Sequence, residues 1–514
     1  MTTAQIIIIA TIVVYLFGMM LVGVIFNKAG AADTSDGFYI GGRKLGPLVT
    51  AMSAEASDMS SWLLMGLPGL AYLAGVAEVG WTAIGLAVGT YLNFLLVARI
   101  LRRYSERIGA FTIPDFFSRR YADQENTLSV VAALIIIIFF VPYTASGFKA
   151  VGTLFNSLFG IEYHVSMIFG ALIIVFYTTM GGFLAVSTTD LIQSIVMSIA
   201  LITIIFFGLD KAGGMGVVME NAKSLPGYLN IMQGYDVTTN SASSYSLLSV
   251  ASTMAWGLGY FGMPHILLRF MGIRNEKELT ISRRIASVWV VISMAVAIFI
   301  GIIGYSMSLA GEIPMLNSSS SESETIIMKI ADLMSQNGFL FAIVAGVILA
   351  GILAATMSTA DSQLLAAASS VSEDFLQDFM RVKLTAAGQM IAARATVVGV
   401  AAVAIILAWN PNSSVFRVVS FAWAGFGAAF GPTMLLALFW RRSNRKGALA
   451  GMIVGGLMIF IWKFGISRIG GVFAIYELLP AFLIGLAVNV IVSLMTKEPS
   501  MVVTKIYDEV HRKQ

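Results

Sequence analysis

About thirteen long apolar segments constrain this chain more than any other feature of its sequence. They lie near residues 5–26, 46–73, 78–100, 127–156, 163–182, 186–209, 246–272, 284–310, 338–368, 393–410, 416–440, 447–466 and 474–496. A helix of about 20 apolar residues is long enough to cross the hydrocarbon core of a bilayer. The pattern therefore predicts an all-α polytopic membrane protein with about 13 transmembrane helices.

The charge content excludes whole classes of function. Only 12% of the 514 residues are charged, whereas charged residues make up about a quarter of a typical soluble domain. The chain has no cysteine, which excludes disulfides, thiol catalysis and cysteine-ligated metals. The sequence contains no phosphate-binding loop of the G-x-x-x-x-G-K type, and His164, His265 and His511 lack metal-ligand spacing. We predict that the protein is not an enzyme.

Basic residues are distributed unevenly over the connections between the apolar segments. One set of connections carries Lys28, Arg43, Lys44, Arg102, Arg103, Arg107, Arg119, Arg120, Arg274, Lys277, Arg283, Arg284, Arg381, Lys383, Arg394, Arg441, Arg442, Arg445, Lys446, Lys497, Lys505, Arg512 and Lys513. The other set carries few, chiefly Lys211, Lys223 and Lys463. Because cytoplasmic loops are enriched in Lys and Arg, we expect the N-terminus outside the cell and the C-terminal tail in the cytoplasm. Residues 211–245 and 312–325 are then expected to form exposed outer loops.

The second apolar segment contains acidic residues in its middle. Glu55 and Asp58 lie in the run AMSAEASDMSSWLLMGLPGLA, with Gly66 and Pro68 beyond them. A charge inside the hydrocarbon region costs several kcal/mol, so such a residue normally faces a cavity, an ion or a partner. The serines around Asp58 compete for backbone hydrogen bonds. We predict a broken helix whose freed carbonyls bind a small cation, as in an ion-coupled transporter.

The seventh segment is interrupted in the same way, five segments later. Gly257, Gly259, Gly262 and Pro264 fall within TMAWGLGYFGMPHIL. Two interrupted segments in corresponding positions indicate inverted repeats with a binding site near the bilayer midplane. We therefore predict repeats over 46–210 and 246–440. An extra helix and loop (1–45) precede them, and two further helices with a short tail (441–514) follow.

The ninth segment carries hydroxyl residues in LAGILAATMSTADSQLL. Thr359 and the carbonyl of Ala355 are four residues apart and share one helical face. Together with Ser358 and the carbonyls of Ala56 and Met59, they form an oxygen-only ligand set of the kind hard cations prefer. Alternatively, these hydroxyls only bond to their own helix or to a neighbouring one. Beside a broken helix with an acidic residue, we favour the sodium site.

Aromatic residues could complete a pocket next to this ion site. Trp256, Tyr260 and Pro264 are spaced four residues apart, on one face if the segment stays helical. With Trp62 and Tyr143, they would line an apolar, uncharged pocket suited to a small, partly apolar solute. The alternative is that they are packing or interfacial aromatics, as Trp and Tyr usually are in membrane helices.

Asp190 admits two interpretations. It lies near the predicted start of the sixth segment and could stabilise the helix dipole there, which we favour slightly. Alternatively, Asp190 could face Asp361 and Ser362 as a candidate second cation site. We interpret His265 as a hydrogen-bonding helix residue.

Four runs resemble the sodium/solute symporter family, and within it the bacterial members that transport proline. They are SDMSSWLLMGLPG, TMAWGLGYFGMPHIL, LAATMSTADSQLL with SSVSEDF, and VSFAWAGFGAAFGP. The resemblance implies a leucine-transporter-like 5+5 inverted repeat in the bacterial plasma (inner) membrane, working by alternating access. It further implies sodium-coupled uptake of L-proline, with no nucleic acid and no obligatory protein partner.

The resemblance also assigns roles to individual residues. Sodium would be held by Ala56, Met59, Ala355, Ser358 and Thr359, with Asp58 and Arg43 acting in coupling. Substrate contacts would come from Ser60, Ser61, Trp62, Tyr143, Trp256, Tyr260 and Pro264. Two positions depart from the family pattern. Ser61 stands where glycine is frequent, and Asp361 stands where a small neutral residue is usual, so the number of sodium ions stays open.

Three alternatives remain at this point. The solute could be another amino acid, pantothenate or a monocarboxylate. A passive channel on the same scaffold would show flux without sodium dependence. A membrane sensor would be expected to carry a cytoplasmic signalling domain, which the residues after Met495 are too few to form.

Overall fold

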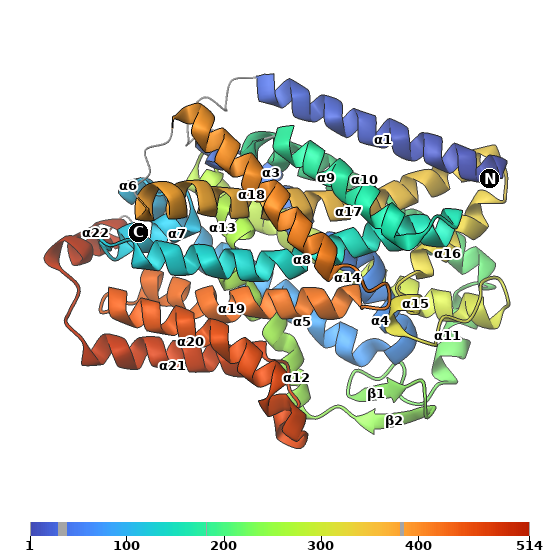
Figure 1. The fold of residues 1–514 in the computed structure, drawn as a ribbon. Helices are drawn as coiled ribbons and strands as arrows, with labels where there is room; N and C mark the ends of the chain where they lie inside the picture. The colour runs from blue at the N-terminus through green and yellow to red at the C-terminus, as the bar shows by residue number, and fades with distance from the viewer. Residues whose placement is uncertain (1, 29–38, 181, 381–384, 513–514) are drawn as a thin grey trace.

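The fold is an almost entirely helical bundle in a computed structural model that describes residues 2–28, 39–180, 182–380 and 385–512 (Figure 1). Its α-helices are α1 (Thr3–Lys28), α3 (Pro47–Asp58), α4 (Leu67–Ala74), α5 (Val76–Leu92), α6 (Ala98–Ile108), α7 (Ile113–Arg120), α8 (Thr127–Phe159), α9 (Tyr163–Met180), α10 (Phe183–Lys211), α11 (Met215–Lys223), α12 (Leu247–Met254), α13 (Pro264–Gly272), α14 (Leu279–Leu309), α15 (Ser320–Ser323), α16 (Ile326–Ser335), α17 (Phe339–Ser369), α18 (Ala386–Leu407), α19 (Val415–Phe439), α20 (Arg445–Phe464), α21 (Leu478–Met495) and α22 (Met501–His511). The strands β1 (Gln233–Asp236) and β2 (Ser241–Ser244) pair antiparallel.

Within the described residues, 10 helices are long and apolar enough to cross a membrane. Three shorter apolar stretches, Trp62–Ala74, Tyr163–Thr179 and Leu247–Phe261, fall on the other three predicted segments. The polytopic helical class is confirmed, whereas the count of 13 spans stays a prediction. The start of α1 and the end of α22 lie at opposite ends of the bundle (Figure 1).

The second apolar segment is broken where the sequence predicts. Helix α3 ends at Asp58, and the backbone bends at Met59 (φ −72°, ψ 18°). A π-helical turn, Trp62–Gly66, then leads into α4. Pro68 in the first turn of α4 has no N–H to donate to a carbonyl of the preceding turn. The predicted interruption is confirmed.

The seventh segment is broken as well. Helix α12 gives way to a 3₁₀ stretch, Ala255–Phe261, before α13 begins at Pro264. The glycines here permit close packing, since a Cβ on Gly257 would lie 2.2 Å from the carbonyl oxygen of Gly85 in α5, and one on Gly259 would lie 2.0 Å from Nε1 of Trp423 in α19. The 3₁₀ turn also changes the register. The expectation that Trp256, Tyr260 and Pro264 share one face required a continuous α-helix. The segment is not a continuous α-helix, so their four-residue spacing does not place them on one face.

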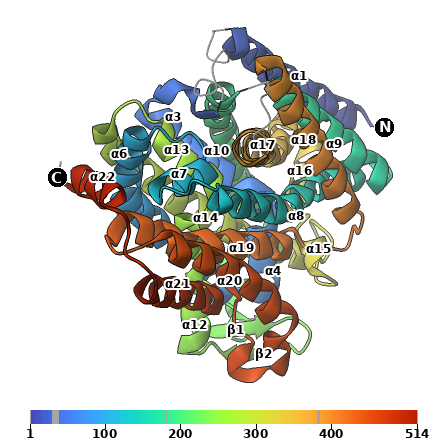
Figure 2. The same ribbon diagram turned by 60° about the vertical axis from the view of Figure 1, so that its left-hand side comes forward.

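Helix α17 is the centre of the bundle. Figure 2 looks nearly along its axis and shows α10, α8 and α18 around it. From Ala345 to Ser369 almost every one of its side chains is buried, including those of Asp361 and Gln363. Unlike the two broken segments, α17 is continuous through its polar stretch.

The two stretches predicted as exposed loops are more structured than expected. Residues 211–245 contain α11 and the hairpin of β1 and β2. In the second stretch, Ser323 and Glu324 are buried, at 1% and 2% exposure. Glu324 forms a salt bridge with Lys149 of α8 at 3.2 Å and accepts hydrogen bonds from Ser414 and the first amides of α19. The prediction of an exposed loop is therefore wrong for the buried part of this stretch, which includes Ser323 and Glu324.

Candidate ion and solute site

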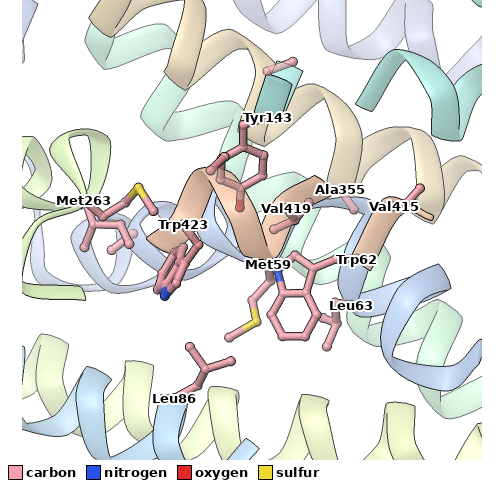
Figure 3. Close-up of a cluster of buried hydrophobic side chains, with 14 of the residues drawn as sticks. Met59, Trp62, Leu63, Leu86, Tyr143, Met263, Ala355, Val415, Val419 and Trp423 are labelled. Atoms are coloured by element: carbon pink, nitrogen blue, oxygen red, sulfur yellow. The ribbon is translucent and has the colours of Figure 1, made fainter. Parts of the chain in front are cut away.

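The break after α3 lies directly against the hydroxyl residues of α17. Ser358 Oγ donates to the carbonyl oxygen of Ala56 at 2.8 Å and also lies 3.2 Å from that of Ala355. Thr359 Oγ1 donates to the same Ala355 oxygen at 3.1 Å. Four of the five residues predicted to hold sodium therefore meet, and all are buried. Met59 lies at the bend itself, and Figure 3 shows it in one cluster with Ala355.

Asp58 is the hub of the polar contacts beside this break. Its carbonyl oxygen accepts hydrogen bonds from the Tyr143 hydroxyl (3.0 Å) and from Nε1 of Trp62 (3.2 Å). Its carboxylate accepts one from the Tyr260 hydroxyl at 2.5 Å, while Oδ1 is buried and has no partner among the described residues. Three elements, α8, the π-helical turn and the 3₁₀ stretch, are thereby tied to the end of α3.

Aromatic rings join this hub to a cavity. The cavity of about 1010 Å³ is lined by Trp256, Phe416 and Tyr476, among others. Trp256 stacks on Tyr476 at 5.4 Å and lies 5.3 Å from Phe416 and 6.0 Å from Trp62, which does not line the cavity. Sequence reasoning missed Phe416 and Tyr476, because nothing distinguishes them from other aromatics of the apolar segments.

The remaining predicted solute contacts are buried but less connected. Ser60 and Ser61 follow the bend, and Ser61 Oγ has no partner in the part of the chain that the structure describes. Pro264 begins α13 and is buried. Glu55, one turn before Asp58, is 1% exposed, and neither of its carboxylate oxygens is hydrogen-bonded by a described residue. The predicted list of ion and solute contacts did not include it.

Asp190, Asp361 and Ser362 gather around an arginine that sequence reasoning missed. Arg269 of α13 donates to Asp190 Oδ2 (3.1 Å) and to Ser362 Oγ (2.5 Å), and its Nε donates to Ser53 Oγ (2.9 Å). The Arg269 side chain is 1% exposed. The sequence did contain an indication of its importance, because Arg269 is a basic residue in the apolar run PHILLRF. A charge in such a run is costly and therefore indicates a functional site or a charged partner.

These contacts also correct the interpretation of Asp190 as a helix-start residue. Helix α10 begins at Phe183, so Asp190 lies almost two turns inside it. The dipole of a helix acts only within its first and last turns, so the favoured interpretation is wrong. Neither oxygen of Asp361, nor Oδ1 of Asp190, has a hydrogen-bond partner among the described residues. The cluster thus holds two carboxylates and one guanidinium.

Arg43 lies away from this cluster, at the end of the bundle that carries α6 and α7. It donates to the carbonyl oxygens of Met271 (2.7 Å) and Ala110 (2.9 Å) and to Ser105 Oγ (3.1 Å). These contacts join the segment before α3 to the ends of α13 and α6. Among the described residues no group of three or more His, Cys, Asp or Glu could hold a metal.

Comparisons with known proteins show similarity in sequence and in fold. The model of the sodium:solute symporter family matches residues 38–455. Sodium/proline symporters of Staphylococcus aureus strains USA300 and JH9 are 39% identical over 495 residues, covering 95% of this chain and 92% of theirs.

Two solved structures share the fold. The substrate-bound outward-open state of a Na⁺-coupled sialic acid symporter covers 96% of this chain, and 99% of that chain is matched, with a TM-score of 0.77 at 18% identity. A nucleobase-cation-symport-1 family transporter in a closed conformation covers 92% of this chain and is matched over 98% of its own, with a TM-score of 0.53 at 14% identity.

Proposed function

Because this chain belongs to the sodium:solute symporter family, we propose that it carries L-proline into the cell together with sodium. Its fold is all-α and leucine-transporter-like. The observation that carries the proposal is the contact of the broken second span with α17, where Ser358 donates to the carbonyl of Ala56. A helix interrupted beside hydroxyls from a second helix provides neutral oxygens at membrane depth, as a sodium site requires.

The proposed sodium ligands are Ala56, Met59, Ala355, Ser358 and Thr359. On binding, sodium would lie between the Ser358 hydroxyl oxygen and the Ala56 carbonyl oxygen, and the hydroxyl would keep its proton and turn it away from the ion. The ion would fix the bend that positions Asp58, and Asp58 in turn holds Trp62, Tyr143 and Tyr260. We assign Asp58 a coupling role on these contacts.

The proposed solute contacts are Ser60, Ser61, Trp62, Tyr143, Trp256, Tyr260 and Pro264. Access runs through the cavity that Trp256 lines, whose charged lining residues are Glu78, Lys149, Glu324, Arg417, Lys463 and Glu477. These three acids and three bases balance, which suits a zwitterion better than an anion. The aromatic surface around Trp62 suits the apolar ring of proline.

Coupling follows from linkage. A ligand shifts a conformational equilibrium only through different affinities for the two states, and two ligands that favour one state raise each other's affinity equally. We propose that sodium and proline favour the same state. In alternating access, repeats 46–210 and 246–440 move relative to each other, with 1–45 and 441–514 as flanking elements. Arg43 would act at the end that must open for release.

The protein is a multi-pass plasma-membrane protein. For its orientation we propose an outside N-terminus and a cytoplasmic C-terminus, because of the bias of Lys and Arg in the loops.

We also propose a second cation at Asp190, Asp361 and Ser362. Arg269 neutralises one of the two carboxylates, which leaves one buried negative charge. An uncompensated charge at this depth is costly, and Asp361 still has two acceptor oxygens without hydrogen-bond donors among the described residues. Two sodium ions would give a sigmoidal dependence of uptake on sodium, and Asp361→Ser should make that dependence hyperbolic.

The first test is uptake of radiolabelled proline into proteoliposomes with an inward sodium gradient, compared with potassium at matched ionic strength. We expect accumulation only with sodium. Asp58→Asn and Thr359→Ala should weaken apparent sodium affinity, and Trp256→Ala should raise the apparent constant for proline more than that for sodium. Sodium-dependent uptake of another amino acid, pantothenate or a monocarboxylate in place of proline would show that the proposed substrate is wrong. Flux indifferent to sodium would indicate a channel.

A further inference from the structure

A second cavity lies between α6 and α14, remote from the proposed transport site. It has a volume of about 410 Å³, and its polar lining includes Arg99, Arg103 and Arg283. No acidic residue is among its lining residues. Outside the cavity, Glu276 forms a salt bridge with Arg103 and lies close enough to Arg99 to interact with it electrostatically. The cavity is therefore strongly basic.

Two of the three arginines have N–H groups that could donate hydrogen bonds to a ligand. Within the described ranges, neither Arg99 nor Arg283 forms a salt bridge, and the recorded side-chain hydrogen bond of Arg99 is a long one to Thr280 Oγ1 (3.5 Å). Arg283 lies over the ring of Tyr91 at 5.1 Å, and its buried Nε has no hydrogen-bond partner in the described chain. Arginines that are not held in a salt bridge are a typical receptor for a phosphate group, which they bind through paired hydrogen bonds.

Apart from Thr280, the rest of the cavity wall is apolar, and part of it is exposed on the outside of the bundle. Leu95, Leu96 and Phe439 line it and are each 42% exposed. Leu95 and Leu96 lie in the membrane-spanning stretch Val76–Ile108. The exposed side chains of Val88 (46%) and Tyr91 (45%) continue this apolar surface along α5. A ligand that enters from the bilayer thus meets an apolar strip first and the arginines at its end.

We propose that this cavity binds the headgroup of an anionic phospholipid. The phosphate would lie between Arg99 and Arg283, and the acyl chains would follow the exposed strip of α5. Basic pockets between helices on the cytoplasmic side commonly hold anionic headgroups. A free phosphate shares the headgroup chemistry, but it would leave the apolar strip uncovered, so we commit to the lipid. The proposal is independent of what the protein transports.

Native mass spectrometry of the full chain in detergent tests this directly. The purified protein is given equal amounts of phosphatidylglycerol and phosphatidylcholine. We expect the wild type to retain phosphatidylglycerol about tenfold better, and Arg99→Gln with Arg283→Gln to abolish the preference. The matched control is Arg284→Gln with Arg394→Gln, which removes two exposed arginines outside the cavity. The control should keep the preference, which separates a specific site from net charge.

Further variants and a competition with inorganic phosphate distinguish a lipid site from a loss of folding and from a site for a soluble anion. Arg99→Gln alone, at an exposed position, should lower the preference without endangering the fold, and Arg99→Lys with Arg283→Lys should retain part of it. Excess inorganic phosphate should not displace the lipid. Wild-type preference in the Arg99→Gln, Arg283→Gln variant would overturn the proposal. Displacement by inorganic phosphate would assign the cavity to a soluble anion and overturn it equally.

Discussion

In the proposed sodium site, single hydroxyls should decide whether the broken second span binds an ion. Ser358 is one of several buried serines on α17, but its hydroxyl reaches another helix, at Ala56. We expect Ser358→Ala to raise the sodium concentration for half-maximal uptake about tenfold, which corresponds to about 1.4 kcal/mol. Uptake at saturating sodium should change little. The measurement is sodium titration of proline uptake in proteoliposomes.

Ser369→Ala is the matched control on the same helix. Its hydroxyl donates to the carbonyl of Ala366, within α17 itself. A hydroxyl that bonds only to its own helix contributes little to binding elsewhere, so its loss should leave the sodium titration unchanged. Equal effects of the two substitutions would contradict the assigned ligand set.

The buried pair of Arg269 and Asp190 is a second feature of individual residues. Removal of one partner leaves an unpaired buried charge, which costs about 3–5 kcal/mol. Arg269→Gln alone should therefore lower the thermal unfolding temperature in detergent strongly. Arg269→Gln with Asp190→Asn should recover much of the loss, because two neutral amides then replace both members of the ion pair. A double variant as unstable as the sum of the single variants would show that the two residues act independently.

Sequence reasoning worked best for residues whose type is costly in a membrane. Asp58 stood out because a carboxylate in an apolar run needs a partner, and Tyr260, Tyr143 and Trp62 do bond to it. Arg269 gave the same signal but was missed. Phe416 gave none, because the side of a helix that meets a cavity depends on tertiary packing.

At the scale of elements, the breaks were predictable and their geometry was not. Serine, glycine and proline mark where a helix stops, and both interruptions fall where those residues cluster. The sequence did not reveal a π-helical turn after the first break or a 3₁₀ stretch at the second. Those depend on which neighbour each turn must meet. The hairpin of β1 and β2 was missed because four-residue strands give too short a pattern.

The crossing of α5 and the 3₁₀ stretch depends on glycine. A Cβ at Gly257 would lie 2.2 Å from the Gly85 oxygen, while one at Gly399 in α18 would meet nothing within 4 Å. Overpacking of this kind costs about 1–3 kcal/mol. Gly257→Ala should lower the unfolding temperature by several degrees and reduce uptake, as thermal unfolding and transport assays would show. Gly399→Ala should do neither. Comparable effects at both sites would contradict the conclusion that close packing requires glycine at position 257.

At the scale of the whole molecule, α22 links elements at the end of the bundle that carries α6 and α7. Its Tyr507, with Tyr104 and Tyr121, surrounds the buried guanidinium of Arg120 at 5.0–5.4 Å. Asp508 forms a salt bridge with Arg441, and Glu509 forms one with Arg107 of α6. These contacts hold α6 and the end of α19 together, so we expect them to favour closure of this end of the bundle.

Truncation before Met501 should therefore favour opening at that end. Since the chain lacks cysteine, single substitutions can report accessibility. We expect truncation to speed thiol labelling of Met271→Cys, a buried position near Arg43, by about tenfold, the equivalent of about 1.4 kcal/mol. Labelling of Ser252→Cys, which lines the large cavity, should slow. Unchanged labelling at both reporters would exclude a latching role for α22.

The large cavity has a consequence in terms of osmotic work. At about 30 Å³ per molecule of liquid water, a volume of about 1010 Å³ corresponds to roughly thirty waters. If alternating access empties and refills this chamber once per cycle, each refilling draws that water in against the osmotic pressure of any solute too large to enter. A large, excluded polymer on the cavity side should then favour the collapsed chamber, so the conformational equilibrium of the carrier would itself respond to osmolality.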